Sequence, residues 1–483
     1  MAQATRNQTS VEGGLYDLVA RGVKDKYFIK DDKESVHLFD WRYERFPATL
    51  PEERWTNPTN QPRFGQRCEF EFELPGDVLV DAALVIELPS WLPPEMVATN
   101  YTTNTYVAES PNTYYGYTNG IGYFLFERIQ IFQDKILLQE VSGDALYVSA
   151  LTKSNWNQGF LTQQLAGIHD GSAVSVMRNA VPGRLEIPLP MLGCMTPGDK
   201  GLPLVGLRDQ PFRLRVQLRP LERLVESRTL ASADGQYNPF PWEKTFTQEQ
   251  STGTITGPAV SLGNMGQINI WLRTKQLYLL NETRKALTEA KAEIPYLRYF
   301  VNTFSAGQLD YSAFDKQTAV IPNIVRFLDA TFTVERVLTF FRNSSSILKN
   351  QLWNMSNSFP GSDGQFYNSI QLTIAGQLRE GPWDASFWQT VETDAKQERT
   401  SSKNIAIMDW GLGWRIEDTP PAARQPTGGL NFSTADRPML TVYLNNVDSN
   451  AQLGYKEIEM ISVCESWGLY KIEKERGQLM YYN

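Results

Sequence analysis

The 483-residue chain has few residues of the kinds that carry metal-dependent or nucleophilic chemistry. Its two histidines, His37 and His169, lie far apart and form neither an HxxxH nor an HExxH motif. A zinc site or a histidine-dependent nucleophile needs such groups together, so we expect both to be structural or surface residues. The chain also lacks a GxSxG elbow, a P-loop and a CxxC motif. We therefore predict no catalytic residue, no bound metal and no cofactor.

Cysteine and positive charge are also scarce. The three cysteines, Cys68, Cys194 and Cys464, are widely separated and odd in number, which implies no disulfide framework and favours a reducing compartment. Lys and Arg number 46 against 54 Asp and Glu, for a net charge of −8. Sequence-independent binding to nucleic acid depends on clustered Lys and Arg, so we expect no direct nucleic-acid partner.

Long apolar runs are missing as well. No stretch approaches the ~20 apolar residues that a membrane-spanning helix needs. The N-terminal sequence MAQATRNQTSVEGG has no apolar core of the kind found in signal peptides. Together these features predict synthesis in the cytosol.

The residues that are present predict a large globular protein. Hydrophobic residues make up 41% of the chain and aromatic residues 12%, enough to build sizeable cores. The length suits two domains of roughly 200 residues each. Residues 226–266 are rich in Ser, Thr, Gly and Pro and poor in alternation, so we predict an inter-domain connection there.

The segment FGQRCEFEFELPGDVLVDAALVIELP, residues 64–89, carries the clearest local pattern. Glutamates alternate with apolar residues over 69–74, a Pro-Gly-Asp break follows, and even positions are apolar over 78–88. This period of two is typical of half-buried antiparallel strands. Similar alternation recurs at residues 128–131, 213–219, 268–272, 370–374 and 440–444. Many short strands without a strand–helix rhythm predict an all-β fold of sandwiches.

Helical signals are few, and several loops are long. We predict a short helix near Leu15, Leu18 and Val19, and another over 281–292 with Asn281 as its N-cap. The Tyr- and Thr-rich stretch 90–120 would be a loop of unusual length, which is typical of exposed or functional segments. Aromatic clusters at 114–117, 383–388 and 410–414 could form a sugar-binding platform, but we favour core or interface packing.

Several stretches, taken in order, resemble the double jelly-roll major capsid proteins of the nucleocytoplasmic large DNA viruses. They include GGLYDLVARGVKDKYF (13–28), RCEFEFELPGDVLVDAALVIELP (67–89) and QPTGGLNFSTADRPMLTVYL (425–444). The last is similar to the family's Pro-Ser-Gly-x-x-Asn-Phe-Ser-Arg-x-Asp stretch and departs from it at Thr427 and Thr434. These departures are typical of a divergent member or a paralogue.

The resemblance implies two consecutive eight-stranded antiparallel jelly-roll sandwiches with short helices and long loops. The first would span 26–225 and the second 267–483, after an N-terminal arm at 1–25. The candidate assembly residues in the arm are Leu15, Leu18 and Val19. Outward loops would lie at 90–120, 142–183, 343–367 and 381–404, and the candidate exposed residues there are Tyr101, Tyr106, Tyr114 and Tyr115.

The function implied is that of a structural protein without catalysis. It would trimerise into pseudo-hexagonal capsomers that tile the icosahedral shell of a large DNA virus. Its partners would be neighbouring capsomers, penton and minor capsid proteins, and an internal viral membrane reached through minor proteins. It would reside in the virion, and in the host cytoplasm during assembly.

Two alternatives stay open at this point. The chain could be a minor capsid paralogue or a membrane-shaping assembly scaffold of the same fold. From another class, it could be a carbohydrate-binding or carbohydrate-hydrolysing β-sandwich protein, which the aromatic clusters and the plentiful carboxylates would serve.

Overall fold

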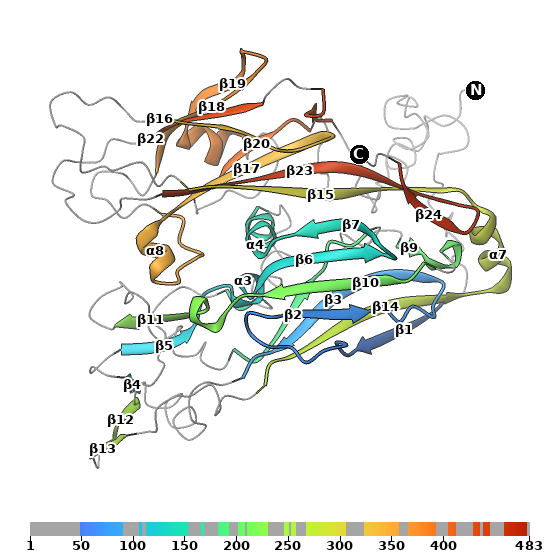
Figure 1. Cartoon of the computed structure of the whole chain (residues 1–483), viewed down its shortest axis with the longest axis horizontal. Helices are drawn as coiled ribbons and strands as arrows, with labels where there is room; N and C mark the ends of the chain where they lie inside the picture. Colours follow the sequence, from blue (N-terminus) through green and yellow to red (C-terminus); the bar gives the residue numbers. More distant parts are fainter. Residues whose placement is uncertain are drawn as a thin grey trace, which may run out of the picture. The chain divides into compact units, whose positions relative to one another are not determined.

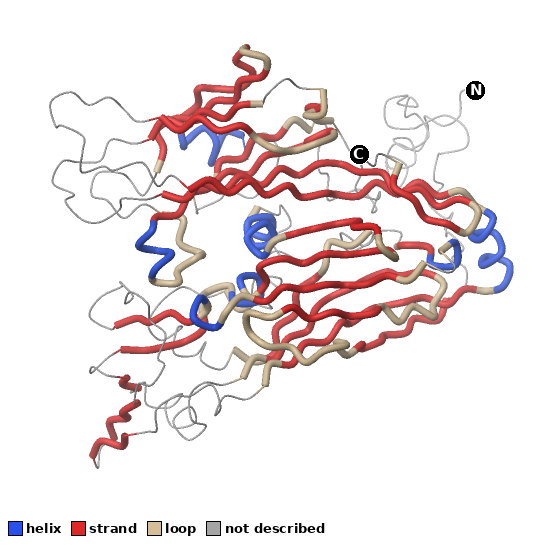
Figure 2. The backbone as a smooth tube through the Cα atoms, viewed as in Figure 1, coloured by secondary structure: helices blue, strands red, loops and turns tan. Residues whose placement is uncertain are grey.

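A computed structural model of the chain is mostly β-sheet, with a few short helices (Figures 1 and 2). One compact unit spans residues 49–483. The structure describes residues 49–89, 106–108, 113–152, 166–168, 182–192, 201–207, 210–229, 246–250, 253–256, 267–305, 323–356, 366–392, 404–411, 428–434, 438–444 and 458–480. The predicted arm, with Leu15, Leu18 and Val19, lies outside these residues.

The first sandwich consists of two antiparallel sheets. In the larger sheet the strand order is β1 (Thr49–Thr56), β14 (Asn269–Leu279), β3 (Val78–Glu87) and β8 (Arg184–Pro188), and β9 (Leu202–Pro203) also pairs with β3. In the facing sheet the order is β2 (Arg67–Glu71), β10 (Phe212–Leu218), β6 (Phe126–Gln133) and β7 (Ile136–Val141). Both sheets contribute to one apolar core.

The second sandwich repeats this arrangement. Its six-stranded sheet has the order β15 (Ala292–Ser305), β23 (Ile458–Glu473), β17 (Thr333–Asn343) and β20 (Ala406–Asp409), with β21 (Leu430–Asn431) on β17 and β24 (Arg476–Leu479) on β23. The facing sheet has the order β16 (Asn323–Phe327), β22 (Met439–Leu444), β18 (Tyr367–Ile374) and β19 (Gln377–Asp384). These strands enclose a second apolar core.

The two sandwiches have the same topology. When the eight main strands of each are numbered along the chain, one sheet has the order 1-8-3-6 and the other 2-7-4-5, in both cases. This is the double Greek key of a jelly roll. The predicted all-β fold of two consecutive eight-stranded jelly rolls is therefore confirmed. No residue-level repeat accompanies the repeat in topology, because a jelly roll requires only alternation and turns, which many sequences satisfy.

The strand pairing corrects one predicted boundary. Strand β14 was assigned to the second jelly roll, but it pairs with β1 and β3 and is the eighth strand of the first. The segment 226–266 therefore connects two strands of the first sandwich, and α7 (Asn281–Glu289) lies between the sandwiches in sequence. The N-cap of α7 is Leu280, one residue before the predicted Asn281. Alternation identifies a strand, but it does not say which sheet the strand joins.

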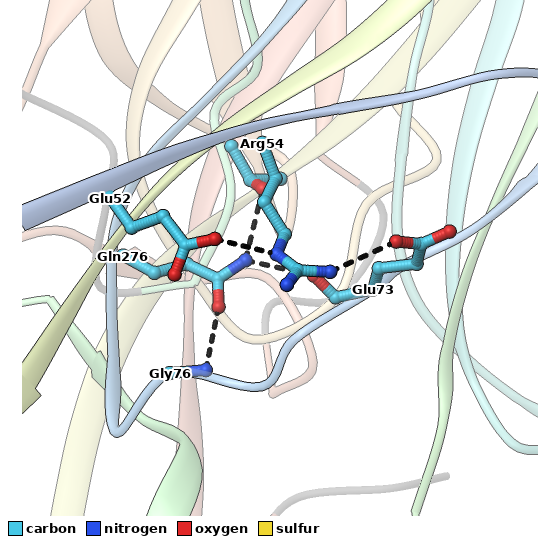
Figure 3. A network of polar contacts seen from close by, with 6 residues as sticks. Glu52, Arg54, Glu73, Gly76 and Gln276 are labelled. Carbon is cyan, nitrogen blue, oxygen red and sulfur yellow. Dashed lines mark hydrogen bonds and ion pairs between the residues drawn. The ribbon is translucent and has the colours of Figure 1, made fainter.

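The Pro-Gly-Asp break after β2 is a corner tied to β14 (Figure 3). The Gly76 N–H donates to Gln276 Oε1 at 2.8 Å, and Gln276 Nε2 donates to the Glu73 carbonyl at 2.8 Å. A Cβ on Gly76 would lie 2.7 Å from the Gln276 Cβ, so only glycine allows this approach. Arg54 bridges Glu52 at 3.0 Å and Glu73 at 3.2 Å, which joins β1 to the same corner.

The predicted long loops contain more regular structure than expected. Residues 113–117 form β5 and pair with β11 (Val225–Thr229). Strand β4 (Tyr106–Ala108) pairs with β12 (Phe246–Gln250), which also pairs with β13 (Gly253–Thr256). The stretch that we expected to be a loop and the one that we expected to be an inter-domain connection therefore form small sheets together, beyond the same ends of the main strands (Figure 1).

The core of the first sandwich continues into the second. It includes Leu338 and Phe340 of β17 together with Ile461 and Val463 of β23. The alternate residues of the same strands, among them Phe341 and Met460, belong to the core of the second sandwich. The central strands of the six-stranded sheet, β17 and β23, are therefore buried on both faces, and β17 is buried along almost its whole length.

Candidate functional site

Metal-ligating and nucleophilic side chains are the first groups to consider for a site. Within the described residues, no cluster of three or more His, Cys, Asp or Glu could hold a metal ion. Cys68 and Cys464 are buried free thiols, and burial raises the pKa of each to about 12, so both stay protonated. His37, His169 and Cys194 lie outside the described residues. Among the helices that the structure describes, none is long and apolar enough to cross a bilayer.

The glutamate row of β2 is half of a charged ladder. Glu69 Oε1 lies 2.9 Å from Arg215 Nε, and Glu71 Oε1 lies 3.7 Å from Arg213 Nε, both across the β2–β10 pair. These side chains are between about a third and two thirds exposed, so each pair contributes only ~0.2–1 kcal/mol. The row therefore belongs to a charge-balanced outer face, and Arg215 also stacks over Phe132 at 4.7 Å.

The aromatic clusters divide between packing and exposure. Trp383 is 43% exposed and stacks on Phe387 with ring centroids 4.6 Å apart. Trp388 is buried and its indole N–H donates to the Trp383 carbonyl. Tyr117, the last residue of the 114–117 cluster, is buried and donates to the Pro89 carbonyl at 2.6 Å. Packing explains most of these rings, and Trp383 is the most exposed of the four.

The candidate loop tyrosines are only partly described. Tyr101 lies outside the described residues, whereas Tyr106 belongs to β4 and both Tyr114 and Tyr115 belong to β5. Their backbones are thus in strands, and their exposure stays a prediction.

Besides the buried end of the predicted loop 90–120, two more of the predicted outward loops contain buried segments. The helix α4 (Gly143–Leu151) starts the predicted loop 142–183, with Ser142 as its N-cap, and most of the helix is buried. In the predicted loop 343–367, residues 349–352 follow α8 (Ser344–Leu348) and are also buried. These parts were wrongly expected to be exposed, because the sequence does not reveal that the other sandwich covers them.

A buried polar cluster joins the two sandwiches at α4. Asp144 accepts from Arg342 of β17 at 2.6 Å and from Arg219 at 2.7 Å. Burial by itself would raise the pKa of Asp144, but the two guanidinium groups outweigh it and hold that pKa well below its usual range. Arg342 is almost fully buried and also lies 5.1 Å from the centre of the Phe340 ring. This network had no signal in the sequence, since its members are 75 and 198 residues apart.

A second set of contacts joins the segment after α8 to the first sandwich. The Asn350 side chain donates to the carbonyls of Glu222 and Val225 at 2.7 and 2.6 Å. The Thr118 hydroxyl donates to the Asn350 carbonyl at 2.8 Å. The Trp353 indole N–H donates to Glu226 Oε2 at 3.0 Å. These buried hydrogen bonds are directional, so they fix how the sandwiches are oriented as well as hold them together.

Strand β7 also meets the second sandwich. It is the edge strand of its sheet, and Gln139 donates to the Leu297 carbonyl of β15 at 2.8 Å. At the end of the neighbouring strand β6, Gln133 Oε1 accepts from the Tyr470 hydroxyl of β23 at 2.8 Å. The second sandwich thus covers an edge that would otherwise be open to other chains.

Comparison with known proteins gives structural matches only. No protein-family model matches the chain, and no curated relative matches it. Among solved structures, VP54 of PBCV-1, in a crystal structure fitted into a cryo-EM reconstruction of the virophage Sputnik, is similar at a TM-score of 0.66 and 14% identity. The match covers 92% of this chain and 100% of that one.

Two further structures agree with that match. A quasi-atomic model of the PBCV-1 virus capsid matches at a TM-score of 0.66 and 13% identity, over 92% of this chain and 100% of that one. The Faustovirus major capsid protein matches at a TM-score of 0.60 and 13% identity, over 90% and 92% of the two chains. At these identities the likeness establishes a shared fold, which confirms the double jelly roll expected from the sequence motifs.

Proposed function

We propose that this protein is a structural capsid protein of a large DNA virus and that it has no catalytic role. The observation that carries the proposal is the complete pair of jelly rolls, which aligns with the full length of the PBCV-1 VP54 chain. Several sequence stretches resemble the same family in the same order, which supports the same proposal. The balanced charge ladder and the protonated, buried thiols of the described residues are consistent with a structural role.

In the proposed assembly, the protein forms a homotrimer with a pseudo-hexagonal outline. Two jelly rolls per chain, repeated by a threefold axis, give six similar sandwiches around a ring. Such capsomers would tile an icosahedral shell and contact penton and minor capsid proteins, with an internal membrane reached through the minor proteins. Its location would be the virion, and the host cytoplasm during assembly.

The test is the mass of the purified protein. Light scattering at micromolar concentration should give three times the chain mass of 54.9 kDa, and negative-stain images should show six-lobed outlines. A monomer at that concentration would contradict the proposal. Abundance in purified virions separates a major shell protein from a minor paralogue or a scaffold that is shed.

The N-terminal arm is a separate part of the proposal. We propose that residues 1–25, with the apolar face of Leu15, Leu18 and Val19, act in higher-order assembly. Deletion of the arm should leave thermal unfolding of the capsomer unchanged and prevent shells from forming. Loss of folding in the deletion variant would contradict this part alone.

The carbohydrate alternative retains one supporting feature, the exposed Trp383 with Phe387 stacked behind it. An exposed ring of this kind can bind the apolar face of a sugar. A glycan array together with a hydrolysis screen would decide this, and binding that is lost in Trp383→Ala would favour a lectin.

A further inference from the structure

The contact inside the chain joins two definite parts of the jelly-roll plan. The donor part is the fifth strand of the first sandwich, β7, with the helix α4 that directly follows it. The acceptor part is the outer face and first strand of the larger sheet in the second sandwich, as the bonds Asp144–Arg342 and Gln139–Leu297 show. Both parts are buried by this contact.

Each of these parts has a counterpart elsewhere in the chain, since both sandwiches have one topology. The fifth strand of the second sandwich is β19, and a helical turn, η6 (Phe387–Val391), follows it as α4 follows β7. The larger sheet of the first sandwich, with β1 as its first strand, corresponds to the six-stranded sheet. One chain therefore contains a second donor part and a second acceptor part.

The second donor part presents exposed apolar side chains. Leu378 is 52% exposed, Trp383 is 43% exposed, and Val391 in η6 is 54% exposed. In α4, by contrast, seven of nine residues are buried. The same position in the fold is covered in one sandwich and open in the other.

The second acceptor part is also open. On the outer face of the first large sheet, Trp55 is 44% exposed and packs edge-on against Trp271, with ring centroids 6.4 Å apart. The Arg184 guanidinium lies 4.6 Å from the centre of the Trp55 ring. These three side chains lie on the face opposite the core residues Ile270 and Leu272, and they form an aromatic platform, which we call the Trp55 platform.

We propose that β19–η6 of one copy binds the Trp55 platform of a second copy, in the way that β7–α4 binds the six-stranded sheet within the chain. The partner is a second copy because the chain itself already contains one instance of this contact between the same two parts of the fold. Donor and acceptor are different surfaces, so each copy uses both, and the contact closes into a ring when the rotation between copies divides a full turn. This inference rests on the proposed trimer and names the surfaces that build it.

Another strand with an exposed apolar side chain serves as a comparison for β19–η6. Strand β16 lies at the opposite edge of the same sheet, where Phe327 is 56% exposed. Its counterpart in the first sandwich is β2, whose edge is covered by the chain itself through Thr59 and Asn60. The contact inside the chain does not use this position, so Phe327 provides a matched control.

The first experiment compares Trp383→Arg with Phe327→Arg in the full chain. Sedimentation over a concentration series should show that Trp383→Arg weakens association by on the order of tenfold or more. The reason is that a charge replaces an aromatic ring that the proposed contact would bury. Phe327→Arg should associate like the wild type, and thermal unfolding should confirm that both variants fold. If Phe327→Arg dissociates the oligomer and Trp383→Arg does not, the assignment is overturned.

The second experiment tests which surfaces meet and holds even if Trp383→Arg fails to fold. Trp383→Cys and Trp55→Cys are placed on separately tagged copies that also carry Cys194→Ser, and the mixture is treated with a bifunctional thiol reagent. The described native thiols, Cys68 and Cys464, are buried. Cross-links should form in the mixture and not with either variant alone.

The outcomes separate this inference from the proposed function. A cross-link in Trp383→Cys alone would mean that like surfaces meet, and no cross-link in an oligomeric mixture would mean that other surfaces meet. Either result overturns the inference and leaves the trimer standing. If the wild-type protein is a monomer, both the proposed trimer and this inference are wrong.

Discussion

The larger sheets of the two sandwiches have the same strand order but different surroundings. In the second sandwich the central strands β17 and β23 are buried on both faces, and β17 is buried along almost its whole length. In the first sandwich only one face of the larger sheet is buried within the chain. The outer face carries Arg273, which bridges Asp81 at 2.8 Å and Glu186 at 2.5 Å. One topology thus supports both a central layer and a surface layer, and the outer-face residues decide which.

Polar groups also differ between the two sheets. In the six-stranded sheet, Arg336 of β17 and Glu465 of β23 form a bidentate pair at 2.5 and 2.9 Å, with both side chains almost fully buried. On the surface sheet, the partners of Arg273 are between a quarter and a half exposed. Removing one partner should therefore be costly in the first setting and mild in the second.

The largest effect should come from the shared core. Phe340→Ala removes a fully buried ring where the two sandwiches meet and should lower the free energy of unfolding by about 4 kcal/mol. Phe327→Ala, at an exposed ring, should change it by less than about 0.5 kcal/mol. Denaturant unfolding of the two variants checks this. Equal effects would mean that the sandwiches do not share a core.

Asp144→Ala should come next, at about 3 kcal/mol. It leaves the guanidinium groups of Arg342 and Arg219 near each other without the carboxylate between them. The matched change on the surface sheet, Asp81→Ala, leaves Glu186 on Arg273 and should cost less than about 1 kcal/mol. Denaturation midpoints at neutral pH measure both, and a smaller loss for Asp144→Ala than for Asp81→Ala would contradict the comparison.

Acid should weaken the same contact. The pKa of Asp144 in the folded protein lies well below its usual 3.8, so the unfolded chain takes up the proton first. The stabilisation by Asp144 is present above about pH 4 and is lost as the pH falls from there toward the folded pKa. Nearby, burial raises the pKa of Glu459, so the folded chain binds this proton at a higher pH than the unfolded chain does. Protonation of Glu459 therefore favours folding as the pH falls, which is opposite in sign to the effect of Asp144.

The test is the pH dependence of Asp144→Asn. Its deficit relative to the wild type should be full at pH 7 and should shrink below pH 4. A deficit that stays constant down to pH 3 would show that the charge of Asp144 contributes nothing.

The smallest effect should come from the charge ladder on the first sandwich. Arg213→Ala removes a pair at 3.7 Å between two side chains that are each more than half exposed. Exposed cross-strand pairs contribute ~0.2–1 kcal/mol, and salt screens them. Unfolding at low and high salt should show a small loss that vanishes at high salt. A loss as large as that of Asp144→Ala would place this ladder in a buried contact between copies.

Much of the fold could be predicted locally. The alternation in β2 and β3 and the Pro-Gly-Asp break between them were read correctly as two strands and a turn. The pattern did not show that β14 closes the first sandwich, because pairing partners 200 residues apart leave no local trace. Nor did it show that residues after α8 are buried, because polar side chains such as Asn350 are satisfied by the other sandwich.

By itself, the sequence determined the all-β fold class, strands such as β2 and β3, and the resemblance to a family of double jelly rolls. Those features depend on side-chain period and residue type, which are local. Only the tertiary structure decided which strands share a sheet, that Glu69 and Glu71 face arginines, and that Asp144 joins the sandwiches. Burial and charge pairing depend on distances through space, which chain folding sets between residues that are remote in sequence.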